Sequence, residues 1–423
     1  MGVNHENNPS EIQSPMEAVV DTKGECKTDL LEKVLARFWE KEAVHIKNAK
    51  TEPATSKGTN FTSDVWRVNF TYTVDDGKDP HTDCVVVKTR PSCEETRKLM
   101  HTKTAFTNEI FAYEHVIPAL SFHVGVPLRV PQFYHGNDNS IVFEDMQKRS
   151  FKTINKKLAV EWNQVWSAIE EMAKLHAASI VMKKTAPEKF EALTNSIIRI
   201  PVEDTEPLGD RQRNALDTIL KVLEESKTPE ATKLIDMLKP ISQNAWLRQK
   251  DIIDDEVPIR VINHGSVWIN NLLYRNDMIT LLDWQHIVYS SPAHDLSFFL
   301  YVNIDTDFLA NKKQKLVDFY LSNLHQFIFD GCVNKITAEE LNELLKPLTS
   351  EWINAELKRF SIYGFMMAQW ITPVFYWSEA VFQTIAEKGG LENMSVEDRM
   401  KHMTSDQRDR MIKLTKLFAE ESK

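Results

Sequence analysis

The stretch that decides the fold spans residues 263–271 and reads Asn-His-Gly-Ser-Val-Trp-Ile-Asn-Asn. A short apolar run, residues 259–263, leads into it, and a second run, residues 278–284, follows it and carries Asp283. This pattern predicts a strand, a loop that ends at Asn271, and a further strand that ends near Asp283. The amide oxygen of Asn271 and the carboxylate of Asp283 are hard oxygen ligands of the kind that suits Mg²⁺. By themselves the two residues would also fit ordinary polar surface loops.

A lysine and a glutamate upstream strengthen the magnesium interpretation. The apolar run at residues 84–88 predicts a strand that ends in Lys88, and Glu109 lies on a predicted helix at residues 104–116. In protein kinases a strand lysine pairs with a helix glutamate and contacts the nucleotide phosphates, while an Asn and an Asp hold the metal. A lysine at a strand end is also common without any such role, because its stem packs on apolar surface while its charge stays in water. The ordered series of all four residues is what favours a phosphotransferase site.

The order of predicted elements indicates two lobes of different class. Strands are expected at residues 66–72, 84–88 and 141–143, within about the first third of the chain. Helices are expected at residues 29–38, 104–116 (ended by Pro118), 160–178, 211–225, 313–329, 338–348, 351–370 and 398–418. We therefore predict an α+β, bilobal architecture with a cleft between the lobes. The expected parts are a polar tail at residues 1–27, a β-rich N-lobe at 28–147 and a helical C-lobe at 148–423.

Composition excludes several classes of function. The 423 residues carry 51 basic and 61 acidic side chains, a net charge of −10, which argues against a nucleic-acid partner. We expect no membrane span, because no apolar run approaches the length of a transmembrane helix. The first residues are polar and lack the apolar core of a signal peptide, and the four cysteines are scattered. These features predict a cytoplasmic protein.

Taken together, the motifs resemble the ecdysteroid kinase-like (CHK kinase-like) family, relatives of choline and aminoglycoside kinases. That family's loop reads His-Gly-Asp-x-Trp-x-x-Asn, followed by Asp-Phe/Trp-Gln and then Ser-Pro-x-x-Asp-Leu. The matching residues are His264-Gly265, Trp268, Asn271, Asp283-Trp284-Gln285, Ser291-Pro292-Ala293-His294-Asp295-Leu296, Asn108-Glu109 and Lys174-Leu175-His176-Ala177. The resemblance implies a protein-kinase-like fold, Mg-ATP as donor, and a hydroxyl of a small organic molecule as acceptor. It also implies that Asp295 braces the loop.

Ser266 stands where the family carries the Asp that accepts the proton of the acceptor hydroxyl. A serine hydroxyl cannot act as a base near neutral pH, and a general base typically contributes about 10²- to 10⁴-fold to the rate. Three hypotheses stay open: a pseudokinase that binds nucleotide, a slow or unconventional kinase, or a chain altered to silence the enzyme.

The nucleotide contacts are the least sharply defined part of the predicted site. No glycine-rich GxGxxG loop is present, although residues 57–63 precede the first strand at the right place. The backbone of such a turn can cover phosphates, and a plain surface turn explains it equally well. The resemblance favours contacts with ATP from Asn60, Phe61, Thr62 and Ser63, together with the hinge residues Glu144 and Met146.

An aromatic and Met-rich segment at residues 363–377 bears on the acceptor. Most of its side chains are expected in the core, and the remainder would line a pocket for a steroid-like alcohol. An aromatic cage for an amino alcohol such as choline is an alternative. A non-catalytic binding module that signals through a protein partner is the alternative from a different class, and the sequence does not identify that partner.

Overall fold

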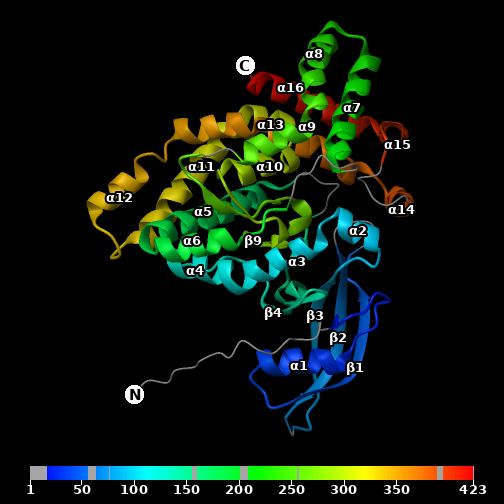
Figure 1. Ribbon diagram of the computed structural model, residues 1–423, viewed down its shortest axis with the longest axis vertical. Coiled ribbons are helices and arrows are strands. Elements are labelled where there is room, and N and C mark those ends of the chain that lie inside the picture. The colour runs from blue at the N-terminus through cyan, green and yellow to red at the C-terminus, as the bar shows by residue number, and fades with distance from the viewer. Residues whose placement is uncertain are drawn as a thin grey trace.

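An antiparallel sheet with one covering helix forms the N-lobe, and a larger mass of helices forms the C-lobe (Figure 1). The computed structural model describes residues 17–55, 63–75, 77–154, 160–200, 208–254, 257–387 and 394–422. The N-terminal elements are α1 (Thr28–Phe38), β1 (Val44–Pro53), β2 (Asp64–Val74), β3 (His81–Thr89), α2 (Glu94–Leu99), α3 (Thr102–Phe111), α4 (Ile117–Val124), β4 (Phe133–Gly136) and β5 (Ser140–Glu144). The predicted α+β, bilobal architecture is confirmed.

The strand order of the N-lobe sheet is β1-β2-β3-β5-β4, and every neighbouring pair is antiparallel. Successive side chains of a strand point to opposite faces. In β3, Val85 and Val87 are buried in the core that α1 covers, whereas Val86 and Lys88 line a cavity on the other face. The alternation of β3 therefore directs Lys88 away from the lobe's own core and toward the C-lobe.

Two N-terminal segments have structure that the sequence pattern did not predict. β1 lies at the edge of the sheet next to β2, and most of its side chains are at least partly exposed. An exposed edge strand needs no apolar alternation, so this segment carries little strand signal. Before α1, Val19 and Val20 are buried in the same small core, and Val20 forms a β-bridge with Cys26.

The prediction that Pro118 ends the helix carrying Glu109 is wrong. The helix continues from α3 through a π-helical turn (Ala112–Val116) into α4. Proline has no backbone N–H and its ring crowds the preceding turn, so it normally ends or kinks a helix. Here the preceding turn is π-helical, which changes the local hydrogen-bond pattern. Pro118 is the second residue of α4, directly after the π-helical turn, so the helix passes through it.

The C-lobe is mainly helical, with short strands around the loop that decides the fold. Its elements are β6 (Lys152–Thr153), α5 (Trp162–Thr185), α6 (Pro187–Ser196), α7 (Leu208–Ser226), α8 (Pro229–Gln243), α9 (Ala245–Asp254), β7 (Val261–Asn263), β8 (Leu272–Arg275), β9 (Met278–Leu281), β10 (Val288–Ser290), α10 (Ala293–Asn303), α11 (Thr306–Cys332), α12 (Ala338–Leu345), α13 (Ser350–Tyr376), α14 (Glu379–Glu387), α15 (Val396–Lys401) and α16 (Ser405–Glu421). β7 and β9 are shorter than predicted, and β10 and β8 are their antiparallel partners.

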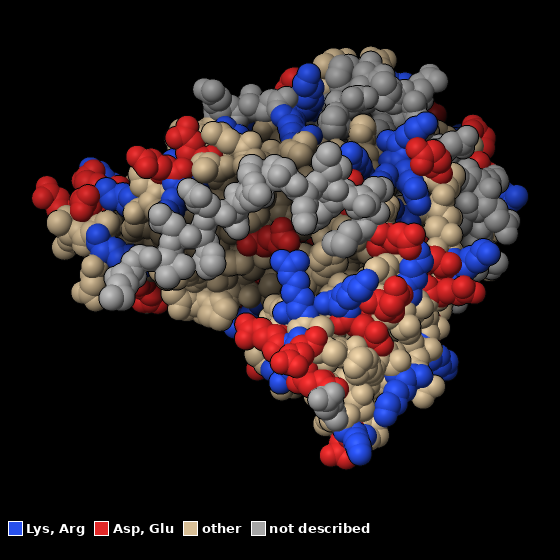
Figure 2. Space-filling model, turned by 60° about the horizontal axis from the view of Figure 1, so that its bottom comes forward, with Lys and Arg blue, Asp and Glu red and all other residues tan. Residues whose placement is uncertain are grey.

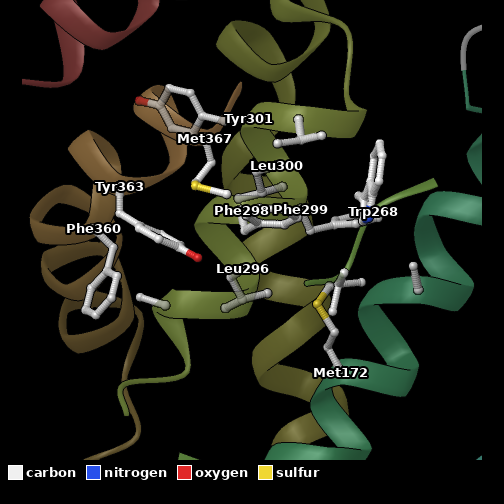
Figure 3. Packing of buried hydrophobic residues seen from close by; sticks show 14 of the residues in the cluster. Met172, Trp268, Leu296, Phe298, Phe299, Leu300, Tyr301, Phe360, Tyr363 and Met367 are labelled. Carbon is white, nitrogen blue, oxygen red and sulfur yellow. The ribbon is translucent and has the colours of Figure 1, made fainter. Parts of the chain in front are cut away.

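One continuous core holds the C-lobe together. α5 packs against α11 and α4, and α10 packs against α13. Figure 3 shows apolar side chains of α10, among them Phe298 and Leu300, between α13 on one side and α5 on the other. Because α10 is buried on every side, the core holds it in place, and it can anchor the residues that its first turn contacts. No described helix is both long enough and apolar enough to cross a membrane.

Candidate active site

A cavity of about 960 Å³ lies between the two lobes. Its walls come from β2 and β3 of the N-lobe, from the connection after β5, and from the loop, α10 and α13 of the C-lobe. Figure 2 shows the hollow from the N-lobe side, with acidic side chains in its depth. Of the predicted site residues that are described, Ser63, Lys88, Glu109, Glu144, Met146, Ser266, Asn271 and Asp283 all line it. Asn60, Phe61 and Thr62 lie outside the described residues.

Lys88 contacts one carboxylate from each lobe. Its Nζ donates to Oε2 of Glu109 at 2.5 Å, and it also forms an ion pair with Asp283. Burial disfavours the charge of Lys88, but Asp283 and Glu109 outweigh that effect and raise its pKa above the ordinary value. The sequence signal for this pairing was the spacing of a strand lysine and a helix glutamate, and the third member, Asp283, comes from the other lobe.

One ammonium and two carboxylates leave this buried group with an excess of negative charge. Burial and the nearby Asp283 raise the pKa of Glu109, although Lys88 opposes the shift. Burial also tends to raise the pKa of Asp283, but Lys88 outweighs it and leaves that pKa below its usual range. Asp283 therefore gives up its proton more readily than Glu109 does, and a divalent cation beside Asp283 would be stabilised.

The hairpin of β8 and β9 places Asn271 next to the segment that carries Asp283. The Leu282 N–H donates to the Asn271 carbonyl oxygen at 2.9 Å, one residue before Asp283. Among the described residues, both side-chain hydrogen bonds of Asn271 use its Nδ2 and go to Ser266, which leaves Oδ1 available there as a ligand. Asp283 itself has a left-handed backbone (φ 67°), and its Oδ2 accepts from Gln285 at 3.2 Å. Oxygen atoms of these two kinds fit Mg²⁺, which binds few protein ligands and completes its shell with phosphates and water.

Gly265 is required by the packing of the loop. Its φ of +85° lies in the region that L side chains rarely adopt. A Cβ at this position would lie 1.9 Å from the carbonyl oxygen of His286, so the backbone of the segment after Asp283 excludes any side chain there. This close approach of the two backbone segments fixes the position of Ser266 relative to Asp283.

Asp295 braces the loop, as the resemblance implied. It lies in the first turn of α10, and its carboxylate accepts from the backbone N–H of His264 at 2.7 Å and of Gly265 at 2.8 Å. Nε2 of His176 lies 3.5 Å from the same carboxylate, and Nδ1 of His294 lies 3.8 Å from it. Burial opposes the negative charge, but these two histidines outweigh it and hold the pKa of Asp295 well below its usual range.

His264 is held as a neutral side chain and has no free nitrogen for proton transfer. Its Nδ1 accepts from the Ser266 N–H at 3.3 Å, and its Nε2 lies 2.9 Å from the Leu282 carbonyl oxygen. Since a carbonyl oxygen can only accept, the network assigns the proton to Nε2. Burial lowers the pKa of His264, in agreement with the neutral form.

The hinge between the lobes is held by Asp145. Its side chain accepts from Arg67 Nε at 2.6 Å and from the Gln147 N–H at 3.0 Å, which caps a 3₁₀ turn that begins at Met146. Met146 is buried and lines the cavity, and Glu144 beside it forms an ion pair with Arg149. The connection is thus fixed by polar contacts on both sides of the residues predicted to contact the nucleotide.

α10 and α13 form the part of the cavity beyond Ser266. Its lining includes Phe298 of α10 and Tyr363, Met367 and Trp370 of α13. Figure 3 shows Tyr363 and Met367 reaching from α13 toward α10, where Phe298 lies. The other side chains at residues 363–374 are mostly buried, so the expectation that most of this segment belongs to the core is confirmed.

Comparison with known proteins places the chain in a family. A sequence model described as the ecdysteroid kinase-like family matches residues 57–330. The chain belongs to the ecdysteroid kinase-like family. A search of curated proteins found no match.

Solved kinases are distant neighbours of this ecdysteroid kinase-like chain. A choline kinase from Cryptosporidium parvum Iowa II is 9% identical with a TM-score of 0.45, over 93% of this chain and 95% of that one. A Plasmodium vivax ethanolamine kinase is 11% identical with a TM-score of 0.40, over 88% of this chain and 83% of that one. The macrolide 2′-phosphotransferase MphH from Brachybacterium faecium is 16% identical with a TM-score of 0.35, over 78% of this chain and 96% of that one. The family assignment rests on the sequence match.

Sequence reasoning missed Asn303, and it named Asn108 only as part of a motif, without the contacts that this residue makes. Asn303, at the end of α10, accepts from the Ile269 N–H at 2.9 Å and donates to the Val267 carbonyl oxygen at 3.2 Å. Asn108 exchanges two hydrogen bonds with the backbone of Ile198, at 2.6 and 3.0 Å. Asn303 lies outside the motifs of the ecdysteroid kinase-like family quoted above, and no local pattern in the sequence indicates which backbone groups these amides would meet.

Proposed function

We propose that the chain is an ATP- and Mg²⁺-dependent phosphotransferase that acts on a hydroxyl of a small organic molecule, an ecdysteroid or a similar alcohol. The proposal rests above all on one observation, the contact of Lys88 with both Glu109 and Asp283 in a cavity that Asn271 and Ser266 also line. A strand lysine, a helix glutamate and two oxygen ligands are the parts that phosphoryl transfer from Mg-ATP needs.

Each group has a distinct task in the proposed reaction. Lys88, fully charged and held by Glu109, orients the nucleotide phosphates, while Asn271 and Asp283 would hold Mg²⁺. When bound, the metal offsets the negative charge on the phosphates. Met146 and Glu144 offer the hinge surface for the adenine, and Ser63 approaches from the N-lobe side. The acceptor would occupy the part of the cavity bounded by α10 and α13.

Ser266 limits the chemistry, because no carboxylate stands at the position of the family's base. Its hydroxyl accepts a hydrogen bond from Asn271 at 3.1 Å and can hold the acceptor hydroxyl, but it cannot remove the proton. Phosphoryl transfer is largely dissociative, so the acceptor proton departs late and positioning and metal supply much of the acceleration. We therefore propose a slow kinase, with a rate lowered by about 10²- to 10⁴-fold relative to one with a base.

The serine at position 266 also favours a second candidate function. A chain that binds nucleotide or a metabolite without turnover would have no need of a base at residue 266, while Lys88 and Asp283 would still hold the nucleotide. A choline- or ethanolamine-type kinase is a further alternative, since Tyr363 and Trp370 offer aromatic faces to a cation.

Nucleotide binding and turnover separate these candidates. Mg-ADP at 100 times its dissociation constant should stabilise the fold by about 2.7 kcal/mol, measured by thermal or chemical unfolding. Turnover of Mg-ATP is then followed with a panel of steroid alcohols and amino alcohols. Stabilisation with slow transfer to one of the alcohols supports the kinase, and stabilisation without any transfer supports the binding module. No stabilisation by any nucleotide with Mg²⁺ or Mn²⁺ refutes the kinase and a module that binds nucleotide.

A further inference from the structure

Separate elements bring cations to one aromatic ring in the cavity wall. The Arg260 guanidinium carbon lies 4.4 Å from the ring centroid of Tyr289, and its NH2 group donates to the Tyr289 carbonyl oxygen at 2.5 Å. Nζ of Lys183, near the end of α5, lies 5.9 Å from the same centroid and donates to the Tyr289 hydroxyl at 3.1 Å. Arg199 lines the same cavity. We call Lys183, Arg199, Arg260 and Tyr289 the basic corner.

Two of these cations have no acidic partner among the residues that the structure describes. Within this part of the chain, Lys183 and Arg260 make their polar contacts with Tyr289. Glu191 also lines the cavity, but it is exposed and pairs with neither. Nε of Arg260 is buried and has no hydrogen-bond partner there. A buried donor without a partner is destabilising, so the corner is incomplete as a purely structural feature.

The charges of the basic corner also disfavour one another. Desolvation and the neighbouring charge of Arg260 lower the pKa of Arg199. The Arg199 guanidinium nevertheless stays protonated near neutral pH, because the ordinary pKa of an arginine lies above about 12. An anion placed beside Arg260 would relieve this repulsion and supply an acceptor for its buried Nε.

The basic corner is connected to the catalytic loop by paired strands. Arg260 directly precedes β7, which leads into the loop of Ser266, and Tyr289 lies in β10, which follows Asp283. Tyr289 pairs with Ile262 in the ladder between these strands. Phe190 packs edge-on against the Tyr289 ring at 5.6 Å, so the surroundings of the charges are partly apolar. A molecule that reaches this corner and the loop lies within one cavity.

We propose that the basic corner binds an anionic group, a carboxylate or a sulfate, carried by the acceptor. The acceptor class is then a largely apolar molecule with a hydroxyl at Ser266 and an anion at Arg260 and Lys183. A guanidinium matches the two oxygens of such a group, and an ammonium adds a further donor. A quaternary ammonium would be repelled by the same charges. The role of this molecule as phosphoryl acceptor rests on the proposed function, whereas the binding of its anionic group does not.

A pair of fluorescent probes tests the corner without knowledge of the true acceptor. The probes are 8-anilinonaphthalene-1-sulfonate and the neutral N-phenyl-1-naphthylamine, which share an aromatic skeleton and differ in the sulfonate. Both are titrated into the full chain with saturating Mg-ADP, so that the phosphate sites are occupied. We expect the sulfonate to bind about 10-fold more tightly, as one good charged contact would give.

Substitutions at the corner and beside it decide whether the preference arises there. Arg260→Gln and Lys183→Gln should each reduce the preference by about 3- to 10-fold. The matched control is Lys184→Gln, which removes the same charge one residue away, where Lys184 pairs with Glu340 outside this cavity. The control should keep the full preference, and far-ultraviolet circular dichroism checks that each variant is folded.

Three results would overturn the proposal: equal affinity for both probes, a preference that both corner variants retain, or displacement of the sulfonate by Mg-ADP, which would assign the cations to the nucleotide. A preference that depends on Arg260 in a chain that no nucleotide stabilises would refute the kinase and leave the anion site standing. Once a substrate is found, Arg260→Gln should raise KM for the acid and leave KM for its methyl ester unchanged.

Discussion

The side-chain amide of Asn271 donates to Ser266 twice, at 2.9 Å to the carbonyl oxygen and at 3.1 Å to the hydroxyl. The residue proposed to hold the metal therefore also orients the residue that stands in place of the base. An aspartate at position 266 would accept the same hydrogen bond, so the surroundings of Ser266 suit a carboxylate.

Ser266→Asp should raise turnover by about 10²-fold or more, the contribution expected of a recovered general base. The measurement is phosphoryl transfer to the alcohol panel, with ATP hydrolysis followed in parallel. Ser266→Asn is the matched control, because it adds similar bulk and no base, and it should not accelerate transfer. Rapid phosphoryl transfer by the unmodified chain would contradict the prediction. An Asp variant that binds Mg-ATP but phosphorylates none of the alcohols would contradict it as well.

Asp283→Asn should abolish the Mg²⁺-dependent part of the stabilisation by ADP, because the charged ligand is lost while the adenine contacts remain. Unfolding temperatures with ADP, in the presence and absence of Mg²⁺, measure this part. Asp277→Asn is the control, since Asp277 is exposed at the turn between β8 and β9. If the Mg²⁺ effect survives unchanged in the Asp283 variant, the carboxylate is only the partner of Lys88.

Gly265→Ala should destabilise the fold and weaken Mg-nucleotide binding, because the new Cβ meets the His286 carbonyl oxygen. Gly125→Ala is the matched control, since Gly125 also has a positive φ (+76°) but a Cβ added there would have nothing within 4 Å. The control variant should cost only backbone strain, about 1–2 kcal/mol, and the Gly265 variant distinctly more by urea unfolding. Equal losses in the two variants would show that the contact with His286 relaxes without cost.

Asp295→Asn should lower the free energy of unfolding at pH 7 by about 3 kcal/mol. An amide has only one acceptor oxygen, so it cannot accept from the N–H groups of both His264 and Gly265 in the present arrangement. Chemical denaturation of both chains measures the difference. A loss below that of an ordinary surface substitution would mean that the loop does not depend on this brace.

The unfolding free energies of the unmodified chain and of the Asp295→Asn variant should respond differently to acid. The fold lowers the pKa of Asp295, so its folded state binds a proton less readily than the unfolded chain does. Its stabilisation is present above the unfolded pKa of about 3.9 and is lost as the pH falls toward the folded pKa. The difference in unfolding free energy should therefore be constant near neutral pH and shrink in more acidic solution, and a difference that grows with acid would reverse the assigned sign.

The sequence by itself determined the lobes, the family and most residues of the candidate site. The apolar run at residues 84–88 indicated a strand that ends in Lys88, and the pattern after Asn271 indicated a further strand that leads to Asp283. The strand β8, which pairs with β9 to form the hairpin, was not predicted. These signals are local, because side-chain direction in a strand or helix follows from the order of residues along the chain. Local signals were weakest where burial imposes no pattern, as in the exposed edge strand β1.

Only the tertiary structure decided which groups those residues contact. Sequence order does not tell that His286 excludes a side chain at Gly265, or that Asn303 holds the loop from the far end of α10. The basic corner shows this most clearly, since Lys183, Arg260 and Tyr289 lie in three separate segments and form no motif. Which side chains converge depends on how helices and strands pack around a shared core, and that packing is a property of the whole chain.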